Sequence, residues 1–339
     1  IKKHFIIIKI VKNMKKNILC FFRAGLGDFY LSFPLFYTLR NTYKNDKLTL
    51  VAPFLAADLL HNKGPWFDEI IEPDKFVPER KYDKVFDMDI TRTGRSAIFK
   101  PEMDYFDMFE ATYDVSFGDR KKLPEILKLE TIDAEKKAVD DLIEHHRSDQ
   151  PDSKNIVLHT TSTSRTPKGK TPPFTWWREL LSHYPQHRFF QVGTTQQIRD
   201  GVVADFHFAN YSPNLNDQRD RFNLRQVAYL LEQTDFFIGV DSVVQHLSLS
   251  TKKKGLVLYG SSDCKMAKHD HNYNLTAKRP CSPCIDNANN LNCCMVRRPD
   301  LWPRVDAVTR ILRENFLLNQ PKKTGWLIEE NQENIPKNL

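Results

Sequence analysis

The sequence has no apolar run of the roughly 18–20 residues that a membrane-spanning helix needs. Its opening segment, residues 4–13, is apolar and basic, but it is too short to span a bilayer and lacks a small-residue cleavage site. Met14 begins "MKKNILCFF", which resembles a natural start, so we expect residues 1–13 to be an upstream extension. These features predict a cytoplasmic protein.

Glycine is scarce, with 12 in 339 residues, and two glycine-dependent phosphate motifs are absent. "RAGLGDFY", residues 23–30, follows the apolar run "NILCFF" and contains two glycines of a dinucleotide fingerprint, but the third is missing. No segment matches G-x-x-x-x-G-K-[ST]. The sequence therefore disfavours a nicotinamide-dependent oxidoreductase and a P-loop nucleotidase.

The net charge of +7 and the pI near 8.9 indicate either an anionic partner or simply a basic solvated surface. Nucleic acid, an anionic membrane surface and a phosphorylated substrate would each fit. The basic residues are spread along the chain and the cysteines lack zinc-finger spacing, so we expect no nucleic-acid partner.

Short apolar runs alternate with amphipathic stretches twice along the chain, separated by the polar segment "HRSDQPDSKN". This alternation predicts an α/β protein with parallel sheets and helices on both faces. We expect two Rossmann-like domains, residues 14–150 and 151–318, facing each other across a cleft, and a polar tail at 319–339. The carboxyl ends of both sheets would line that cleft.

In the first half, Asp28 stands between a Gly-Leu-Gly turn and an apolar helix expected over residues 28–43, with Pro34 as an irregularity. Its position is typical of a residue that caps the helix. A carboxylate at the cleft could equally take a proton from an incoming hydroxyl. The sequence leaves both roles open.

In the second half, polar residues follow three predicted strands. Hydroxyl groups and cations together can hold phosphate oxygens, although a solvated basic loop would have the same composition. Aspartate, serine and histidine around a helix start could bind a nucleotide sugar, or could be a cap and a structural histidine. The candidates are Thr160, Thr161, Lys168 and Lys170 in the first loop, Asp241, Ser242 and His246 in the second, and Gly260 and Ser261 in the third.

Four of the six cysteines lie together in "CSPCIDNANNLNCC", within a loop at 281–294. Four thiolates could hold structural zinc or iron in a reducing compartment, but adjacent cysteines are awkward ligands of one ion. A cysteine-rich loop without metal is the alternative. The four residues are Cys281, Cys284, Cys293 and Cys294.

Three segments in order resemble the lipopolysaccharide heptosyltransferase family, glycosyltransferase family nine, which has the GT-B architecture. The opening motif is similar to "GLGDFYLSFPLFYTLR", the middle motif to "LHTT" followed by "KTPPFTWWREL", and the third to "DSVVQHLSL" followed by "LYGSSD". The resemblance extends from Ile18 to about Cys294. Val243 stands where the family has glycine, and the middle loop is longer by "STSRTPKG", so Pro-Trp spacing favours Lys170 over Lys168.

The resemblance implies an inverting, metal-independent glycosyltransferase whose first domain binds the acceptor and whose second binds the nucleotide-sugar donor. Asp28 would be the base, and Lys170 would stabilise the departing diphosphate. Some relatives carry a similar cysteine-rich insertion, and one glycoprotein-modifying branch holds iron there.

The family default is ADP-heptose as donor and lipopolysaccharide core as acceptor. Another nucleotide sugar, a protein acceptor or a non-catalytic nucleotide-binding protein are the alternatives. Peripheral contact with the inner membrane would suit a glycolipid, met by a basic face with exposed aromatic side chains in the first domain. Those aromatic residues are Phe54, Trp66, Phe99 and Tyr105.

Overall fold

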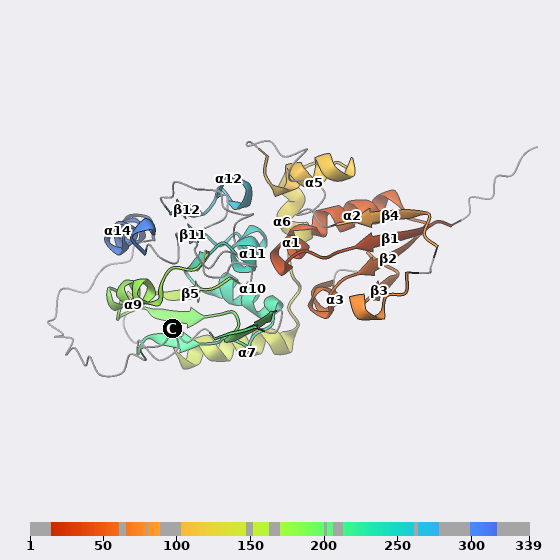
Figure 1. Ribbon diagram of the computed structural model, residues 1–339. Coiled ribbons are helices and arrows are strands. Elements are labelled where there is room, and N and C mark those ends of the chain that lie inside the picture. The colour runs from red at the N-terminus through yellow and green to blue at the C-terminus, as the bar shows by residue number, and fades with distance from the viewer. Residues whose placement is uncertain are drawn as a thin grey trace, which may run out of the picture.

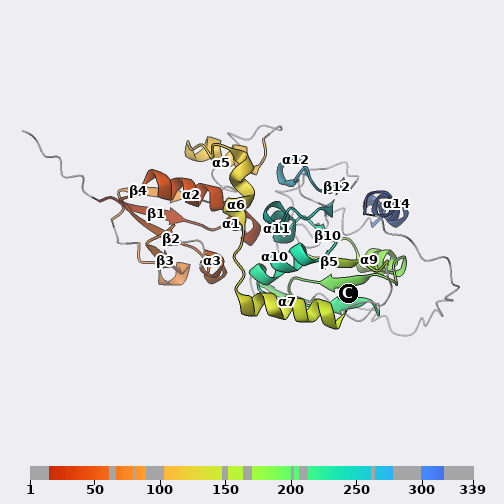
Figure 2. The same ribbon diagram turned by 180° about the vertical axis from the view of Figure 1, so that it is seen from behind.

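The computed structural model describes residues 15–60, 66–78, 81–88, 103–146, 152–162, 170–199, 202–205, 213–260, 264–277 and 299–316. It has two separate parallel sheets, each accompanied by helices (Figures 1 and 2). Across these described ranges, no helix combines the length and the hydropathy that crossing a membrane would require.

The first sheet has four strands in the order β3-β2-β1-β4, all parallel. Its central strand β1 and its neighbour β2 are apolar and buried, as expected for strands covered on both faces. The strands are β1 (Asn17–Phe21), β2 (Lys47–Val51), β3 (Glu69–Ile71) and β4 (Lys84–Asp87). The helices of this half are α1 (Leu26–Leu31), α2 (Phe33–Thr42), α3 (Phe54–Leu60), α5 (Tyr105–Tyr113), α6 (Leu123–Leu127) and α7 (Asp133–His145), with 3-10 turns η1 (Pro73–Lys75) and η2 (Arg120–Lys122).

The second sheet has six parallel strands in the order β12-β11-β10-β5-β6-β9. The strands are β5 (Asn155–His159), β6 (Arg188–Gln191), β9 (Leu215–Asp217), β10 (Phe236–Val240), β11 (Gly255–Tyr259) and β12 (Tyr273–Thr276). A separate antiparallel pair comprises β7 (Gln196–Arg199) and β8 (Val202–Asp205). The helices are α9 (Phe174–Ser182), α10 (Leu224–Gln233), α11 (Val243–Thr251), α12 (Cys264–Ala267) and α14 (Val305–Phe316), and η3 spans Pro299–Leu301.

Two expected helices are shorter than their apolar patterns. Residues 28–43 belong to two helices, α1 and α2, which meet at Ser32. Pro34 lies in the first turn of α2, where its missing N–H costs nothing. The helical period of residues 103–117 also extends past α5, which ends at Tyr113 because Asp114 adopts a left-handed conformation with φ +50°.

Apolar packing joins the two halves beneath the cleft. One continuous core runs from β1 and α1 through α6 to the face of the second sheet that carries α10 and α11. Within it the buried Tyr30 hydroxyl donates to Ser250 Oγ at 2.8 Å, from α1 to α11. Because an apolar interface resists domain motion, α1 and α11 are held in a fixed relation.

Helix α7 precedes the second sheet in sequence, yet it packs along α10 (Figure 1). Arg225 of α10 forms an ion pair with Glu135 of α7 at 2.7 Å and a second with Asp58 of α3 at 3.0 Å. The Arg225 side chain is only 12% exposed, so this bridge between three helices is largely shielded from water. The predicted boundary at residues 150 and 151 stays a prediction.

Candidate functional site

Three neighbouring strands of the second sheet end at one edge, and each is followed by predicted site residues. Thr160 and Thr161 follow β5, Asp241 and Ser242 follow β10, and Gly260 follows β11. The strands are parallel, so their carboxyl ends coincide. Helix α1 of the first half packs against α11 here, which brings both halves of the chain to the same place.

Lys170 and Asp241 form an ion pair at this edge. Lys170 Nζ lies 2.6 Å from Asp241 Oδ2, with 21% of the lysine side chain and 6% of the aspartate side chain exposed. The other carboxylate oxygen, Oδ1, accepts from Gln245 Nε2 at 2.6 Å. The sequence placed Lys170 and Asp241 in one cleft but did not anticipate that they pair with each other.

Ser242 is tied to His159, the last residue of β5. The serine Oγ lies 2.8 Å from His159 Nδ1. Burial lowers the pKa of His159 to about 4, so its imidazole is neutral near pH 7. The ring packs against Gly193, where φ is +123° and a Cβ would lie 3.2 Å from His159 Nε2, so glycine is required there.

His246 faces the first half of the chain. Its Nδ1 lies 2.9 Å from His269 Nε2, and its ring meets Tyr105 edge-on at a centroid distance of 6.2 Å. Burial lowers the pKa of His246 to about 4, opposed by Asp241 and assisted by Lys170. A Cβ on Gly27 would lie 2.9 Å from His246 Cδ2, so the second glycine of the Gly-Leu-Gly turn permits close approach of α1 to α11.

Asp28 lies in the first turn of α1, half-buried. Its Oδ2 accepts from the backbone N–H of Gly25 at 3.1 Å, which is the geometry of a helix cap. Asp28 therefore has a structural role as a helix cap. Gly27 approaches His246, so α1, the helix that carries Asp28, packs against α11 of the second half.

The threonine hydroxyls are more deeply placed than the sequence suggested. Thr160 is buried, and its Oγ1 accepts from Gln191 Nε2 of β6 at 3.1 Å. Thr161 is buried as well, close to Gly193. Lys168, Ser261 and the four cysteines, Cys281, Cys284, Cys293 and Cys294, lie outside the described residues. Within the described ranges, no three histidine, cysteine or acidic side chains are grouped to hold a metal.

The aromatic residues expected on an exposed face of the first domain are not exposed where the structure describes them. Trp66 is half-buried, with its ring edge-on to Phe33 at 5.4 Å. Tyr105 is half-buried against His246. Packing of large rings against the core explains both. Phe99 and the side chain of Phe54 lie outside the described part of the chain.

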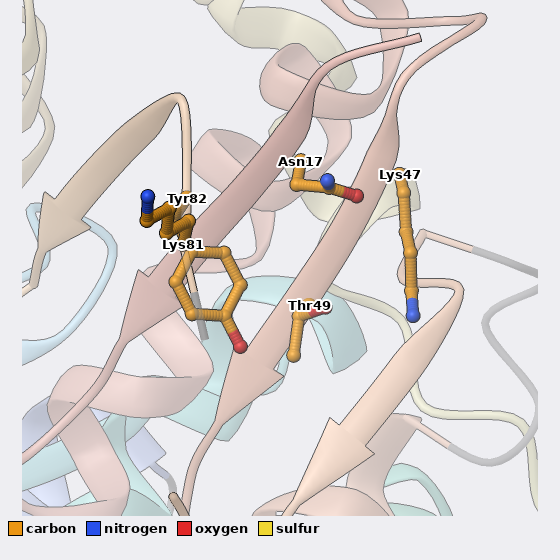
Figure 3. A pocket seen from close by; sticks show the side chains of 5 residues that line it. All are labelled: Asn17, Lys47, Thr49, Lys81 and Tyr82. Carbon is orange, nitrogen blue, oxygen red and sulfur yellow. The ribbon is translucent and has the colours of Figure 1, made fainter. Parts of the chain in front are cut away.

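A cavity of about 280 Å³ lies elsewhere, against the first sheet (Figure 3). Asn17 and Lys47 are the first residues of β1 and β2, so the cavity is at the amino ends of these strands. The remaining lining residues are Thr49, Lys81 and Tyr82. Ligands of open α/β sheets bind at the carboxyl ends, so this cavity is separate from the candidate site.

Sequence reasoning missed the buried partners of the site: Gln191, Gln245, Tyr259 and His269. Gln245 follows Asp241 by four residues, and side chains at this spacing near a helix start can meet. That spacing is the sequence signal for the contact between Gln245 and Asp241. His269 and Tyr259 reach the site only through the arrangement of strands and loops.

Comparisons with known proteins agree with this arrangement. The family model "Glycosyltransferase family 9 (heptosyltransferase)" matches residues 104–295, more than half of the chain. Among curated proteins no sequence gives a significant match.

Similar solved structures share the fold at low sequence identity. A family 9 glycosyl transferase from Veillonella parvula has a TM-score of 0.61 at 13% identity, covering 90% of this chain and 98% of that one. The iron-containing heptosyltransferase TibC from enterotoxigenic E. coli has a TM-score of 0.61 at 15% identity, covering 89% and 77%. E. coli ADP-heptose LPS heptosyltransferase II has a TM-score of 0.52 at 14% identity, covering 88% and 99%. The chain therefore belongs to glycosyltransferase family 9, the heptosyltransferase family, and is a glycosyltransferase of the GT-B fold.

Proposed function

We propose that this protein is an inverting glycosyltransferase that moves a sugar, heptose before others, from a nucleotide-diphosphate donor to a lipopolysaccharide core or related glycan. The observation that carries the proposal is the Lys170–Asp241 pair at the carboxyl edge of the second sheet, whose helix α11 packs against α1, the helix that carries Asp28. A cation on one side and a carboxylate on the other are what a single displacement at an anomeric carbon requires.

In the proposed reaction Asp28 takes the proton of an acceptor hydroxyl, whose oxygen attacks the anomeric carbon of the donor. The bond from that carbon to the diphosphate oxygen breaks, and the diphosphate departs with the electron pair. Lys170 stabilises the negative charge that develops on it. One displacement inverts the anomeric centre and needs no metal or cofactor.

Ser242 and His246 are suited to bind the donor, because both are neutral hydrogen-bonding groups at fixed positions. His159 fixes Ser242, and His269 fixes His246. Neutral imidazoles accept or donate hydrogen bonds to sugar hydroxyls without charge repulsion. Thr160, Thr161 and Gly260 would complete the wall around the donor, joined by Lys168 and Ser261, whose places the structure does not describe.

ADP-heptose is the first donor to examine. TibC has been solved in complex with ADP-D-beta-D-heptose, and E. coli heptosyltransferase II carries ADP-heptose in its name. Another nucleotide sugar or a protein acceptor is the alternative, and a non-catalytic nucleotide-binding role ranks below both. A glycan acceptor on a lipid would place the enzyme in the cytoplasm, in peripheral contact with the inner membrane.

The cysteine cluster at Cys281, Cys284, Cys293 and Cys294 carries a separate proposal, a structural zinc or iron site. The description of TibC as iron-containing supports it by analogy of fold. Metal analysis of the purified protein tests it: about one zinc or iron per chain is expected. A purified protein that contains no zinc or iron and has all six of its thiols free would rule the site out.

The transferase proposal is tested by incubating the purified protein with ADP-heptose, and separately with UDP- and GDP-sugars, and measuring nucleotide diphosphate release. Release from one donor class, raised by lipopolysaccharide core acceptor, is expected. If no nucleotide sugar is turned over and none protects the protein against heating, the proposal fails.

A further inference from the structure

Behind the Lys170–Asp241 pair, two buried side chains form a hydrogen-bonded chain into the interior. Gln245 Nε2 donates to Asp241 Oδ1 at 2.6 Å, and Tyr259 Oη donates to Gln245 Oε1 at 2.5 Å. Gln245 lies in the first turn of α11 and Tyr259 ends β11. Both are fully buried, so water does not compete for these bonds.

These hydrogen bonds run in one direction, from Tyr259 through Gln245 to Asp241. Asp241 as a carboxylate only accepts, so Gln245 must turn its NH₂ group toward it and its carbonyl toward Tyr259. The tyrosine hydroxyl has one hydrogen and supplies it to that carbonyl; its second neighbour, the Ala267 carbonyl, is farther at 3.3 Å. Burial, followed by the nearby Asp241, raises the pKa of Tyr259, so the hydroxyl keeps its hydrogen.

The direction matters because of Lys170. With Oδ1 of Asp241 engaged by Gln245, Oδ2 is presented to Lys170 Nζ at 2.6 Å. A lysine side chain has many rotamers, and a carboxylate fixed on its far side selects one of them. If Gln245 turned its carbonyl toward Asp241 instead, two acceptor oxygens would face each other in the protein interior. Their repulsion would displace the carboxylate.

We propose that Gln245 and Tyr259 are positioning residues for the leaving-group site: they orient Asp241, which sets Lys170 where the donor diphosphate will lie. Neither touches the donor; both act through Asp241. The inference rests on the proposed role of Lys170 in holding the diphosphate.

The first experiment measures ADP binding by calorimetry, with UDP and GDP alongside, and donor turnover. Tyr259→Phe and Gln245→Leu are expected to weaken nucleotide diphosphate binding about tenfold and to lower kcat at saturating donor. Each substitution removes a buried hydrogen bond from the series that ends at the charged Asp241. Tyr184→Phe is the matched control: it removes a buried tyrosine hydroxyl bonded to the Thr309 carbonyl at 3.2 Å, under α14. That variant should lose a similar amount of thermal stability and keep wild-type binding and kcat.

A double-mutant cycle separates positioning from general destabilisation. Lys170→Met should weaken ADP binding, and adding Gln245→Leu to it should weaken binding no further, because the chain acts through the lysine. An equal additional loss in the Lys170→Met background would overturn the inference, as would Tyr259→Phe and Gln245→Leu variants that lose only stability. If Gln245→Leu does not fold, Tyr259→Phe, which removes one oxygen, completes the same cycle.

The same variants separate the proposed role of Lys170 from the proposed role of Gln245 and Tyr259. Lys170→Met with unchanged ADP binding and turnover would remove the proposed leaving-group role of Lys170, and the inference with it. An impaired Lys170→Met beside a wild-type-like Tyr259→Phe and Gln245→Leu would leave that role intact and refute only the positioning chain.

Discussion

The two sides of the cleft are built differently. On the side of the second sheet, Asp241, Ser242 and His246 each bond a buried side chain from the protein interior: Gln245, His159 and His269. On the side of the first sheet, Asp28 accepts a hydrogen bond from the backbone N–H of Gly25, the capping residue of its own helix. Buried side-chain networks specify one geometry, whereas a helix cap fixes its carboxylate through the local backbone. The comparison predicts a preformed geometry for the residues proposed to bind the diphosphate sugar.

Asp28→Asn has the largest expected effect, and it changes a residue of the first half alone. The amide can still accept the Gly25 hydrogen bond but cannot take a proton, so transfer should fall by about a hundredfold to ten-thousandfold. ADP affinity and thermal stability should be close to wild type. Retained full transfer in a donor-turnover assay would refute Asp28 as the base.

Acid should lower the free energy of unfolding first through two buried histidines beside the second sheet. Burial holds the pKa values of His159 and His246 at about 4, while in the unfolded chain they protonate near 6.5. The folded state binds fewer protons, so their contribution is complete above pH 6.5 and is lost as pH falls toward 4, on the order of 3 kcal/mol for each. Thermal unfolding across this range measures it.

His159→Asn is the control for that pH dependence, because asparagine keeps a polar side chain beside Ser242 but does not titrate. The slope of stability between pH 6.5 and 4 should become shallower in this variant. An unchanged slope would mean that His159 is already protonated in the folded protein.

Gly27→Ala tests how closely the two sides must approach. Its Cβ would lie 2.9 Å from His246 Cδ2 in the buried contact between α1 and α11, so we expect a loss of about 1–3 kcal/mol in unfolding free energy. Gly25→Ala is the comparison, since its Cβ would meet only the end of the Asp28 side chain, at 3.3 Å, and should cost less. Equal stability of the two variants would contradict a tight contact at Gly27.

Much of this arrangement could be predicted from sequence because it depends on local pattern. Apolar runs followed by polar residues placed Asp241 and Ser242 at a strand end, and parallel strands bring such ends together. The direction in which a side chain faces could not be predicted this way. Thr160 turns to Gln191 of β6 inside the protein, a neighbour that only strand order supplies.

The same limit applies to the partners that act at a distance in sequence. Tyr259 and His269 reach the site because β11 and the turn after α12 lie beside α11, which no periodicity encodes. The division of residues 28–43 into α1 and α2 had a local signal in Pro34, and the end of α5 at Asp114 depended on a backbone conformation that aspartate adopts only occasionally.

The position of α7 has a consequence for exchanging parts between relatives. Its Val139 is buried in the core shared with α10, and its Glu135 neutralises Arg225. A chimera that takes its second half from a relative at residue 151 would pack a foreign α10 against the native α7. The apolar contact between the two helices and the partner of the shielded arginine would then no longer be the native ones. Joining the two sequences ahead of α7, near Thr131, keeps α7 with its own α10, so an exchanged second half should begin ahead of α7 and not at the second sheet.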